Sequence, residues 1–174
     1  GYTNRTHLRI ETLSGLRELD LQIAGGKVKS VIVGMGKAAV GDDIAFRAGD
    51  ADIVCTPVSV GNPHAVIFAD DVEEIPLTVL GPQIEHPENF PGGVNVEFVQ
   101  VLSEKELRMR VWERGSGVTM ACGTGACASA AAAAARGYCE YDTPVSVHLD
   151  GGTLKIQIAR NGAVTMAGPA EIVY

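Results

Sequence analysis

A run of small apolar residues constrains the fold of this chain more than any other feature. Residues 125–136 read G-A-C-A-S-A-A-A-A-A-A-R, and Gly137 follows. Alanine has the highest helix propensity and glycine suits the position after a helix, so the run predicts a helix over residues 125–136. A helix with no charged face before Arg136 is usually buried. The run therefore predicts a thin central helix that strands approach closely on every side.

Most of the remaining chain alternates apolar and polar residues with the two-residue period of a strand. Gly151-Gly152 and Asn161-Gly162 supply turn residues for two hairpins. The expected fold is α+β, with a mixed or antiparallel, curled, barrel-like sheet wrapped around the buried alanine-rich helix. A short surface helix is expected over residues 75–84. Strands are expected at residues 7–12, 17–23, 28–35, 51–60, 65–69, 94–103, 106–113, 145–149, 153–159 and 163–167.

Composition excludes several classes of partner. The chain has 174 residues, is 46% hydrophobic and carries a formal net charge of −7. Its 14 basic residues are scattered, whereas nucleic-acid binding needs clustered Lys and Arg. No apolar stretch has the length of a bilayer span, and no charged-then-apolar leader opens the chain. We expect a soluble cytoplasmic protein that binds neither nucleic acid nor membrane.

The four cysteines, at positions 55, 122, 127 and 139, do not form a C-x-x-C pair. The four histidines are dispersed, so the close ligand pairs of a structural zinc site are missing and no metal is expected. Disulfides are not expected in a reducing compartment. The cysteines are therefore predicted to be free thiols.

The stretch before the alanine run contains the strongest indication of chemistry. It reads E-R-G-S-G-V-T-M-A-C-G-T-G-A-C over residues 113–127, so Cys122 stands where the helix begins. The first N–H groups of a helix have no internal partner and carry partial positive charge. With little side-chain bulk at Gly123 and Gly125, a carboxylate could bind these groups, and the same charge is expected to lower the pKa of Cys122. The other three cysteines are read as small buried hydrophobic residues.

Two further stretches place polar residues among apolar strands. In G-N-P-H, Asn62 and His64 interrupt residues 58–68, where an unsatisfied polar group would be costly. They are either a hydrogen-bonded structural kink or a substrate amide and a histidine that tunes a thiol. In F-P-G-G-V-N-V-E-F, Asn95 opens a strand, and taken alone it reads as a turn residue.

These motifs together resemble the diaminopimelate epimerase family. The resemblance rests on A-C-G-T-G-A-C after E-R-G-S-G-V-T, with G-N-P-H and F-P-x-x-V-N-V-x-F upstream. It extends from T-N-R at residues 3–5 to G-P-A-E-I-V-Y at the C-terminal end. It implies two pseudo-symmetric halves, each a curled sheet around a helix, with the active site between them. It also implies two cysteines on opposite faces of the substrate α-carbon, without pyridoxal phosphate or metal, that interconvert LL- and meso-diaminopimelate on the route to lysine and peptidoglycan.

The resemblance also implies a role for individual residues. Cys122 corresponds to the second catalytic cysteine, and Gly123 and Thr124 to the amides that hold the reacting carboxylate. Glu113 and Arg114 correspond to substrate ligands, as do Asn62 and Asn95 at the distal end of the substrate. His64 and Glu113 correspond to residues that modulate thiol pKa values, and Tyr174 to a tyrosine associated with a homodimer.

One part of the family pattern is missing from these residues. The family's first half enters its own central helix through G-N-G-x-R-C, and nothing here matches that segment. We expect residues 1–24 to be the last strands of the first half, residues 25–167 the second half, and residues 168–174 a strand that returns to the first. The chain is then expected to be a fragment of a complete enzyme, inactive alone, rather than a natural truncation. A proline racemase or hydroxyproline epimerase relative and a non-enzymatic amino-acid-binding half-domain are the alternatives, and retention of Cys122 favours an enzyme.

Overall fold

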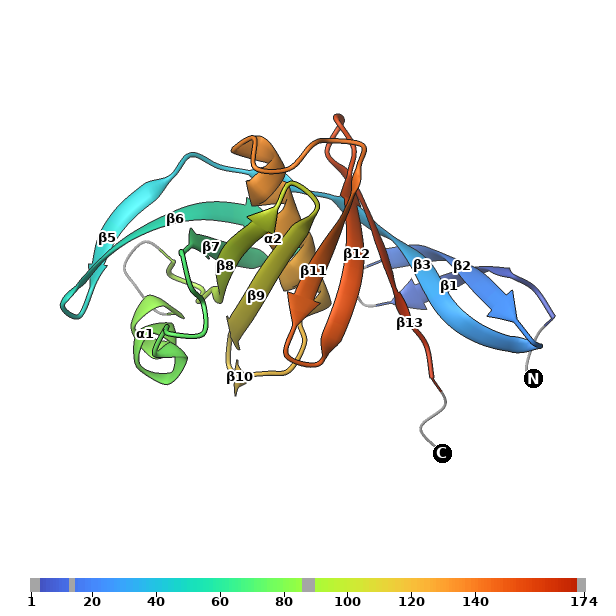
Figure 1. Ribbon diagram of the computed structural model, residues 1–174, viewed down its shortest axis with the longest axis horizontal. Coiled ribbons are helices and arrows are strands. Elements are labelled where there is room, and N and C mark those ends of the chain that lie inside the picture. The colour runs from blue at the N-terminus through green and yellow to red at the C-terminus, as the bar shows by residue number, and fades with distance from the viewer. Residues whose placement is uncertain (1–3, 13–14, 86–89, 172–174) are drawn as a thin grey trace.

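The computed structural model describes residues 4–12, 15–85 and 90–171 and consists mainly of one large sheet (Figure 1). The helices are α1 (Leu77–Glu85) and α2 (Gly123–Ala135). The strands are β1 (His7–Thr12), β2 (Gly15–Ala24), β3 (Lys27–Lys37), β4 (Ala39–Val40), β5 (Ile44–Ala48), β6 (Ala51–Ser59), β7 (Pro63–Phe68), β8 (Asn95–Ser103), β9 (Glu106–Glu113), β10 (Gly117–Val118), β11 (Pro144–Leu149), β12 (Gly152–Ile158) and β13 (Ala163–Pro169).

Every strand predicted from the alternating pattern is present, with ends that differ from the prediction by no more than two residues. Within the described ranges, β4, β5 and β10 were not predicted. Two of them have only two residues, too few to show a period. The third, β5, does alternate: Ile44 and Phe46 pack on one core cluster, and Ala48 is buried in it.

The sheet is mixed, and both helices lie in its parallel connections. Its strands run in the order β1-β2-β3-β13-β12-β11-β9-β8-β7-β6-β4, with β10 on β9 and β5 on β6. The pairs β7–β8 and β9–β11 are parallel, and the other pairs are antiparallel. Parallel neighbours need a crossover, usually a helix. α1 supplies the crossover from β7 to β8, and α2 the one from β9 to β11.

Helix α2 is enclosed by the sheet, as its alanine content predicted. Its residues from Gly125 to Ala134 are all buried, and it contacts β4, β6, β7, β8, β9, β11, β12 and β13. Figure 1 shows it behind β8, β9 and β11, while β1 and β2 lie apart from it. The hydrogen-bonded path of described strands ends at β1 and β4, so closure into a barrel is not confirmed.

Both ends of α2 have local causes in the sequence. The helix begins two residues earlier than predicted, with Cys122 in extended conformation as its N-cap residue. At the other end Gly137 has a φ of +76° and donates to Ala134 O at 3.1 Å, while Tyr138 N donates to Ala133 O at 2.9 Å. This pair of bonds is a Schellman motif, which requires the left-handed conformation that glycine adopts without strain. The predicted role of Gly137 is confirmed.

Helix α1 is the short surface helix that the sequence predicted, and one of its faces is buried while the other is exposed. Leu77, Gly81 and Ile84 are buried, and α1 covers a second core cluster with Val96 and Phe98 of β8. Pro82 lies inside α1. It forfeits one helical hydrogen bond, and burial of the apolar face offsets that loss. The cluster around α2 lies on the other face of the sheet and includes Val99 of the same strand.

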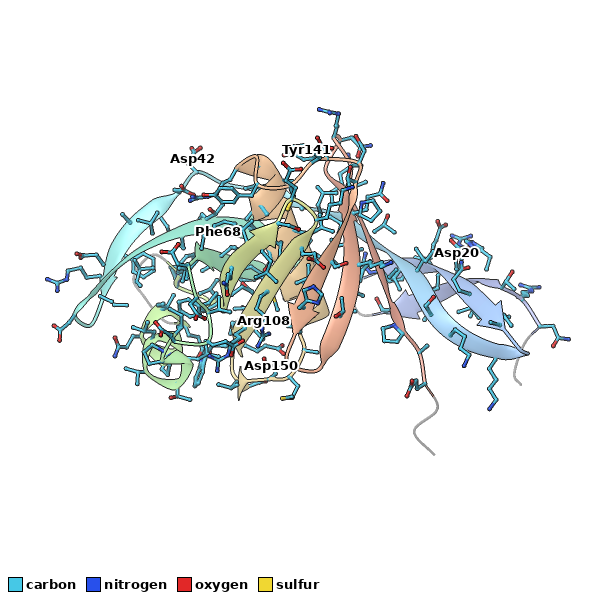
Figure 2. The ribbon with its side chains drawn as sticks, viewed as in Figure 1. Asp20, Asp42, Phe68, Arg108, Tyr141 and Asp150 are labelled. Carbon is cyan, nitrogen blue, oxygen red and sulfur yellow. The ribbon has the colours of Figure 1, made fainter. Side chains whose placement is uncertain are left out.

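An ionic contact holds the parallel β9–β11 region together on the outside. Figure 2 shows Arg108 on β9 beside Asp150, which follows β11. The guanidinium of Arg108 donates to the Asp150 carboxylate and also to His148 O at 3.2 Å. No helix in the described ranges is long and apolar enough to cross a membrane.

Candidate active site

The site is built at the N-terminus of α2. Cys122 is 7% exposed, and its Sγ accepts a hydrogen bond from the Gly125 N–H at 3.4 Å. The Ala126 N–H bonds to Cys122 O at 2.9 Å, which closes the first turn. The N–H groups of Gly123 and Thr124 donate to no acceptor among the described residues. Beside the sulfur there are thus two backbone donors free to bind an anion.

Because Gly125 has no side chain, the Glu97 carboxylate and the Cys122 sulfur can both approach its backbone closely. A Cβ at this position would lie 2.7 Å from Glu97 Oε1 and 3.2 Å from Cys122 Sγ. The prediction that a glycine removes bulk here is therefore correct, but the space at Gly125 is taken by a carboxylate of the protein itself. Glu97 belongs to β8 and lies between Val96 and Phe98.

A line of hydrogen bonds connects Glu97 to Cys122. His64 Nδ1 lies 2.7 Å from Glu97 Oε1, and His64 Nε2 lies 3.0 Å from Asn62 Oδ1. Asn62 Nδ2 donates to Thr124 Oγ1 at 3.3 Å, and Thr124 Oγ1 is 3.7 Å from Cys122 Sγ. We call these five side chains the polar chain. Asn62 and His64 are thus a hydrogen-bonded kink, and the kink leads to the thiol.

Glu97 was not among the candidate residues that the sequence motifs indicated. It is 0% exposed, and burial raises its pKa against the opposing effect of His64. Its Oε2 accepts no hydrogen bond from any residue that the structure describes. The available signal was a charged residue inside the apolar strand V-N-V-E-F, since a buried carboxylate needs a specific partner.

The predicted pKa shift of Cys122 is wrong in direction. The structure raises the pKa of this thiol to about 11, first through burial and then through the negative charge of Glu97. The Gly125 N–H and the Thr124 hydroxyl lower it, as expected of a helix N-terminus, and Glu113 adds a smaller increase. Desolvation of the sulfur exceeds the stabilisation by the helix start.

Asn95 and Arg114 lie together beside the polar chain. Asn95 Nδ2 donates to Pro63 O at 3.1 Å, and Asn95 Oδ1 accepts from the Arg114 N–H at 3.0 Å. Asn95 is thus more than a turn residue, because it joins the Asn62–His64 kink to the end of β9. The Arg114 side chain is exposed and donates to Gly92 O at 3.0 Å. Glu113 accepts a hydrogen bond from the Thr119 hydroxyl.

The remaining expectations concern the state of the cysteines, a metal site and Tyr174. All four cysteines are free and buried, and burial raises the pKa of Cys55 and of Cys127 to about 12. In the described part of the chain, no group of three His, Cys, Asp or Glu side chains could hold a metal ion. Tyr174 lies outside the described residues.

Comparison with known proteins gives consistent matches in sequence. The family model of diaminopimelate epimerase matches residues 56–173. The diaminopimelate epimerase of Bacillus licheniformis is 48% identical over 182 residues, which cover 97% of this chain and 64% of the relative. That of Bacillus subtilis is 46% identical over 184 residues, again with 97% and 64% coverage. The chain thus spans 64% of the length of these two relatives.

Solved structures show the same fold at low identity. A hydroxyproline epimerase from Agrobacterium vitis has a TM-score of 0.71 at 20% identity. The match covers 96% of this chain and 58% of the solved chain. A phenazine biosynthesis protein of the PhzF family from Enterococcus faecalis has a TM-score of 0.69 at 14% identity, with 99% of this chain and 64% of the other covered. At such identities the likeness concerns the fold, so it gives no support to a proline-type substrate. The family model and the close sequence relatives agree with the thiol at the start of a buried helix, and the chain belongs to the diaminopimelate epimerase family.

Proposed function

We propose that this chain supplies one of the two thiols of a cofactor-independent epimerase that interconverts LL- and meso-diaminopimelate. The observation that carries the proposal is the N-terminus of α2, where Cys122 Sγ lies beside the free N–H groups of Gly123 and Thr124. Membership of the family supports the choice of substrate.

The proposed reaction is a proton transfer across one carbon atom. A thiolate removes the α-proton, so the C–H bond breaks and its electron pair spreads into the adjacent carboxylate. A thiol on the opposite face then gives its proton to the same carbon, which inverts the centre. The N–H groups of Gly123 and Thr124 would bind the carboxylate where the negative charge develops. Cys122 would act as base in one direction and as acid in the other.

The opposite thiol is proposed to come from outside these 174 residues. The relatives are longer than this chain, and no G-N-G-x-R-C segment occurs in it. We therefore propose the division into residues 1–24 and 168–174, which belong with the other half, and residues 25–167. Its support is that the strands that α2 contacts, β4, β6, β7, β8, β9, β11, β12 and β13, all begin within residues 25–167. The thiol pair needs neither pyridoxal phosphate nor a metal for this step.

The remaining residues are proposed to shape the substrate end of the site. Arg114 would bind the distal carboxylate, because its exposed guanidinium is bonded only to the Gly92 carbonyl in the described contacts. Glu113 would bind the α-amino group and, with His64, adjust the thiol pKa. The amides of Asn62 and Asn95 already have protein partners, so each would exchange or share a partner on contact with substrate. Tyr174 is proposed to contribute to a homodimer of the whole enzyme.

The test follows LL-diaminopimelate in D₂O by isomer ratio and α-deuterium content. Two proteins are compared: this chain alone, and a fusion with the part of the Bacillus licheniformis relative that this chain does not cover. The fusion is expected to form the meso isomer, and Cys122→Ser is expected to slow it by about 10² to 10⁴, the usual contribution of an acid–base group. Cys139→Ser is the matched control, because that thiol is also buried but lies apart from the polar chain.

Two outcomes would contradict the proposal. A fusion that binds substrate and works equally well with Cys122→Ser would remove Cys122 from the reaction. Formation of the meso isomer by this chain alone, lost in Cys122→Ser, would require a second base within these residues and would refute the division of the two thiols.

A further inference from the structure

The amide of Asn62 gives the polar chain a direction. An amide oxygen can only accept and an amide nitrogen can only donate. Because Asn62 Oδ1 faces His64 Nε2, that ring nitrogen carries a hydrogen and donates it. Because Asn62 Nδ2 donates to Thr124 Oγ1, the hydroxyl hydrogen of Thr124 remains available for Cys122 Sγ. Each bond thus points toward the sulfur.

The other end of the polar chain holds one proton between two groups. Glu97 Oε1 and His64 Nδ1 are 2.7 Å apart, and both side chains are 0% exposed. With Nε2 protonated, either Glu97 carries the proton and donates to a neutral ring, or the ring carries it and donates to the carboxylate. The pair has a net charge of zero in both arrangements.

We propose that Glu97 is a positioning residue for Cys122: it fixes the Nε2–H form of His64 and thereby the direction in which Asn62 and Thr124 donate. The proposal rests on the proposed function only in taking Cys122 as the reacting thiol. Glu97 touches no reacting atom in this scheme, and its effect reaches the sulfur through three intervening side chains.

The zero net charge of the Glu97–His64 pair matters because the surroundings of Cys122 are otherwise acidic. Its titratable neighbours are Glu97 from β8, Glu113 at the end of β9, His64 from β7 and Cys127 within α2. An ionised Glu97 without a protonated partner would place a second buried anion against Gly125, beside the thiolate. The proton shared with His64 reduces that repulsion.

For Glu97→Leu the proposal predicts a higher pKa of Cys122, whereas removal of a repelling negative charge alone would lower that pKa. Glu97→Leu removes the group that sets the tautomer, so the Thr124 hydroxyl no longer has a fixed direction. The Cys122 pKa is then expected to rise by about one unit and alkylation at pH 8 to slow about tenfold, as for loss of one hydrogen bond to an anion. Glu97→Gln keeps an N–H donor for His64 Nδ1 and should leave the Cys122 pKa within about 0.3 unit.

The measurement is the pH dependence of iodoacetamide alkylation of the intact 174-residue chain, followed by mass spectrometry on the peptide that contains Cys122. Val99→Ala is the control for lost packing, since Val99 lies on the same strand and is fully buried in the cluster around α2. It is expected to leave the Cys122 pKa unchanged. Nitrogen-15 NMR of the His64 ring is expected to show a protonated Nε2 in the unaltered chain.

An unchanged or lowered Cys122 pKa in Glu97→Leu overturns the proposal, and so does a Val99→Ala shift of the same size. If Glu97→Leu does not fold, a lowered Cys122 pKa in Glu97→Gln or an unprotonated His64 Nε2 overturns it equally. None of these readouts needs turnover. Failure of the proposed epimerase activity and failure of this inference are therefore separate results.

Discussion

Leucine at any of four consecutive positions in α2 is expected to destabilise the protein. Successive residues of an α-helix point about 100° apart, so four in a row face every side of the helix. Ala130, Ala131, Ala132 and Ala133 are each no more than 1% exposed. A helix that lay on the surface of a sheet would leave at least one of these four positions open to solvent.

The expected cost follows from the space around these alanines. Leucine adds three carbon atoms where the surrounding strands leave no room, and overpacking of a dense core costs about 1–3 kcal/mol. With a urea dependence of about 2 kcal/mol per molar, a loss of about 2 kcal/mol lowers the urea midpoint by about 1 M. Ala135 is exposed on the same helix, so Ala135→Leu is the control and should change stability by less than about 0.5 kcal/mol.

The assay is urea unfolding followed by the fluorescence of Trp112, the only tryptophan, whose ring donates to Glu85 at 2.8 Å. Hydrogen exchange of the α2 amides should be among the slowest in the unaltered chain, because they open only when the sheet around them does. If one of the four leucine variants keeps the midpoint of the unaltered protein, α2 has an open side and its enclosure by strands is refuted.

Three further expectations concern the site and its thiols. At neutral pH, limited iodoacetamide should label Cys122 before Cys139 and the other thiols, because Cys122 is the most exposed of the four cysteines. Preferential labelling of another cysteine would contradict the assignment of Cys122 as the most reactive thiol. Gly125→Ala should lower the melting temperature, because its methyl group would lie 2.7 Å from Glu97 Oε1. Stability should fall as pH rises above about 9, since the folded state retains thiol protons that the unfolded state loses. Cys127→Ala, which removes a thiol with a pKa of about 12, should weaken that fall in urea midpoint.

Local sequence signals predicted the elements but not the pairing of the strands. The alanine run, Gly137 and the two-residue period act within one element, so they can be read from the sequence alone. The parallel register of His64 with Asn95 cannot be read in this way, because it depends on where the α1 crossover returns the chain. The contacts of α1 cannot be read in this way either, because they include β5, β9 and β10 as well as β8, which follows α1 along the chain.

The site shows the same division between local and nonlocal causes. Cys122 and His64 interrupt local patterns and were therefore identified as candidates. Glu97 was missed because its importance arises only when β8 lies against the start of α2, where the carboxylate approaches Gly125. The sign of the Cys122 pKa shift was missed for a related reason. A helix start is a local feature that lowers the pKa, whereas burial is a property of the whole fold and raises it.

A thiol pKa of about 11 leaves only about 10⁻³ of Cys122 ionised at pH 8. A general base works best with a pKa near the operating pH, so donors to the sulfur must strengthen when the base is needed. Among the described residues the Thr124 hydroxyl, at 3.7 Å, is the nearest side-chain donor to the sulfur, and a shorter contact would strengthen this hydrogen bond. In the direction in which Cys122 acts as base, Thr124→Val should therefore shift the acidic limb of the pH–rate profile of the fusion, on which the rate rises with pH, to higher pH, while Thr124→Ser should restore it. If Thr124→Val lowers the rate equally at every pH, the hydroxyl acts on binding or packing, and its role in ionising Cys122 is refuted.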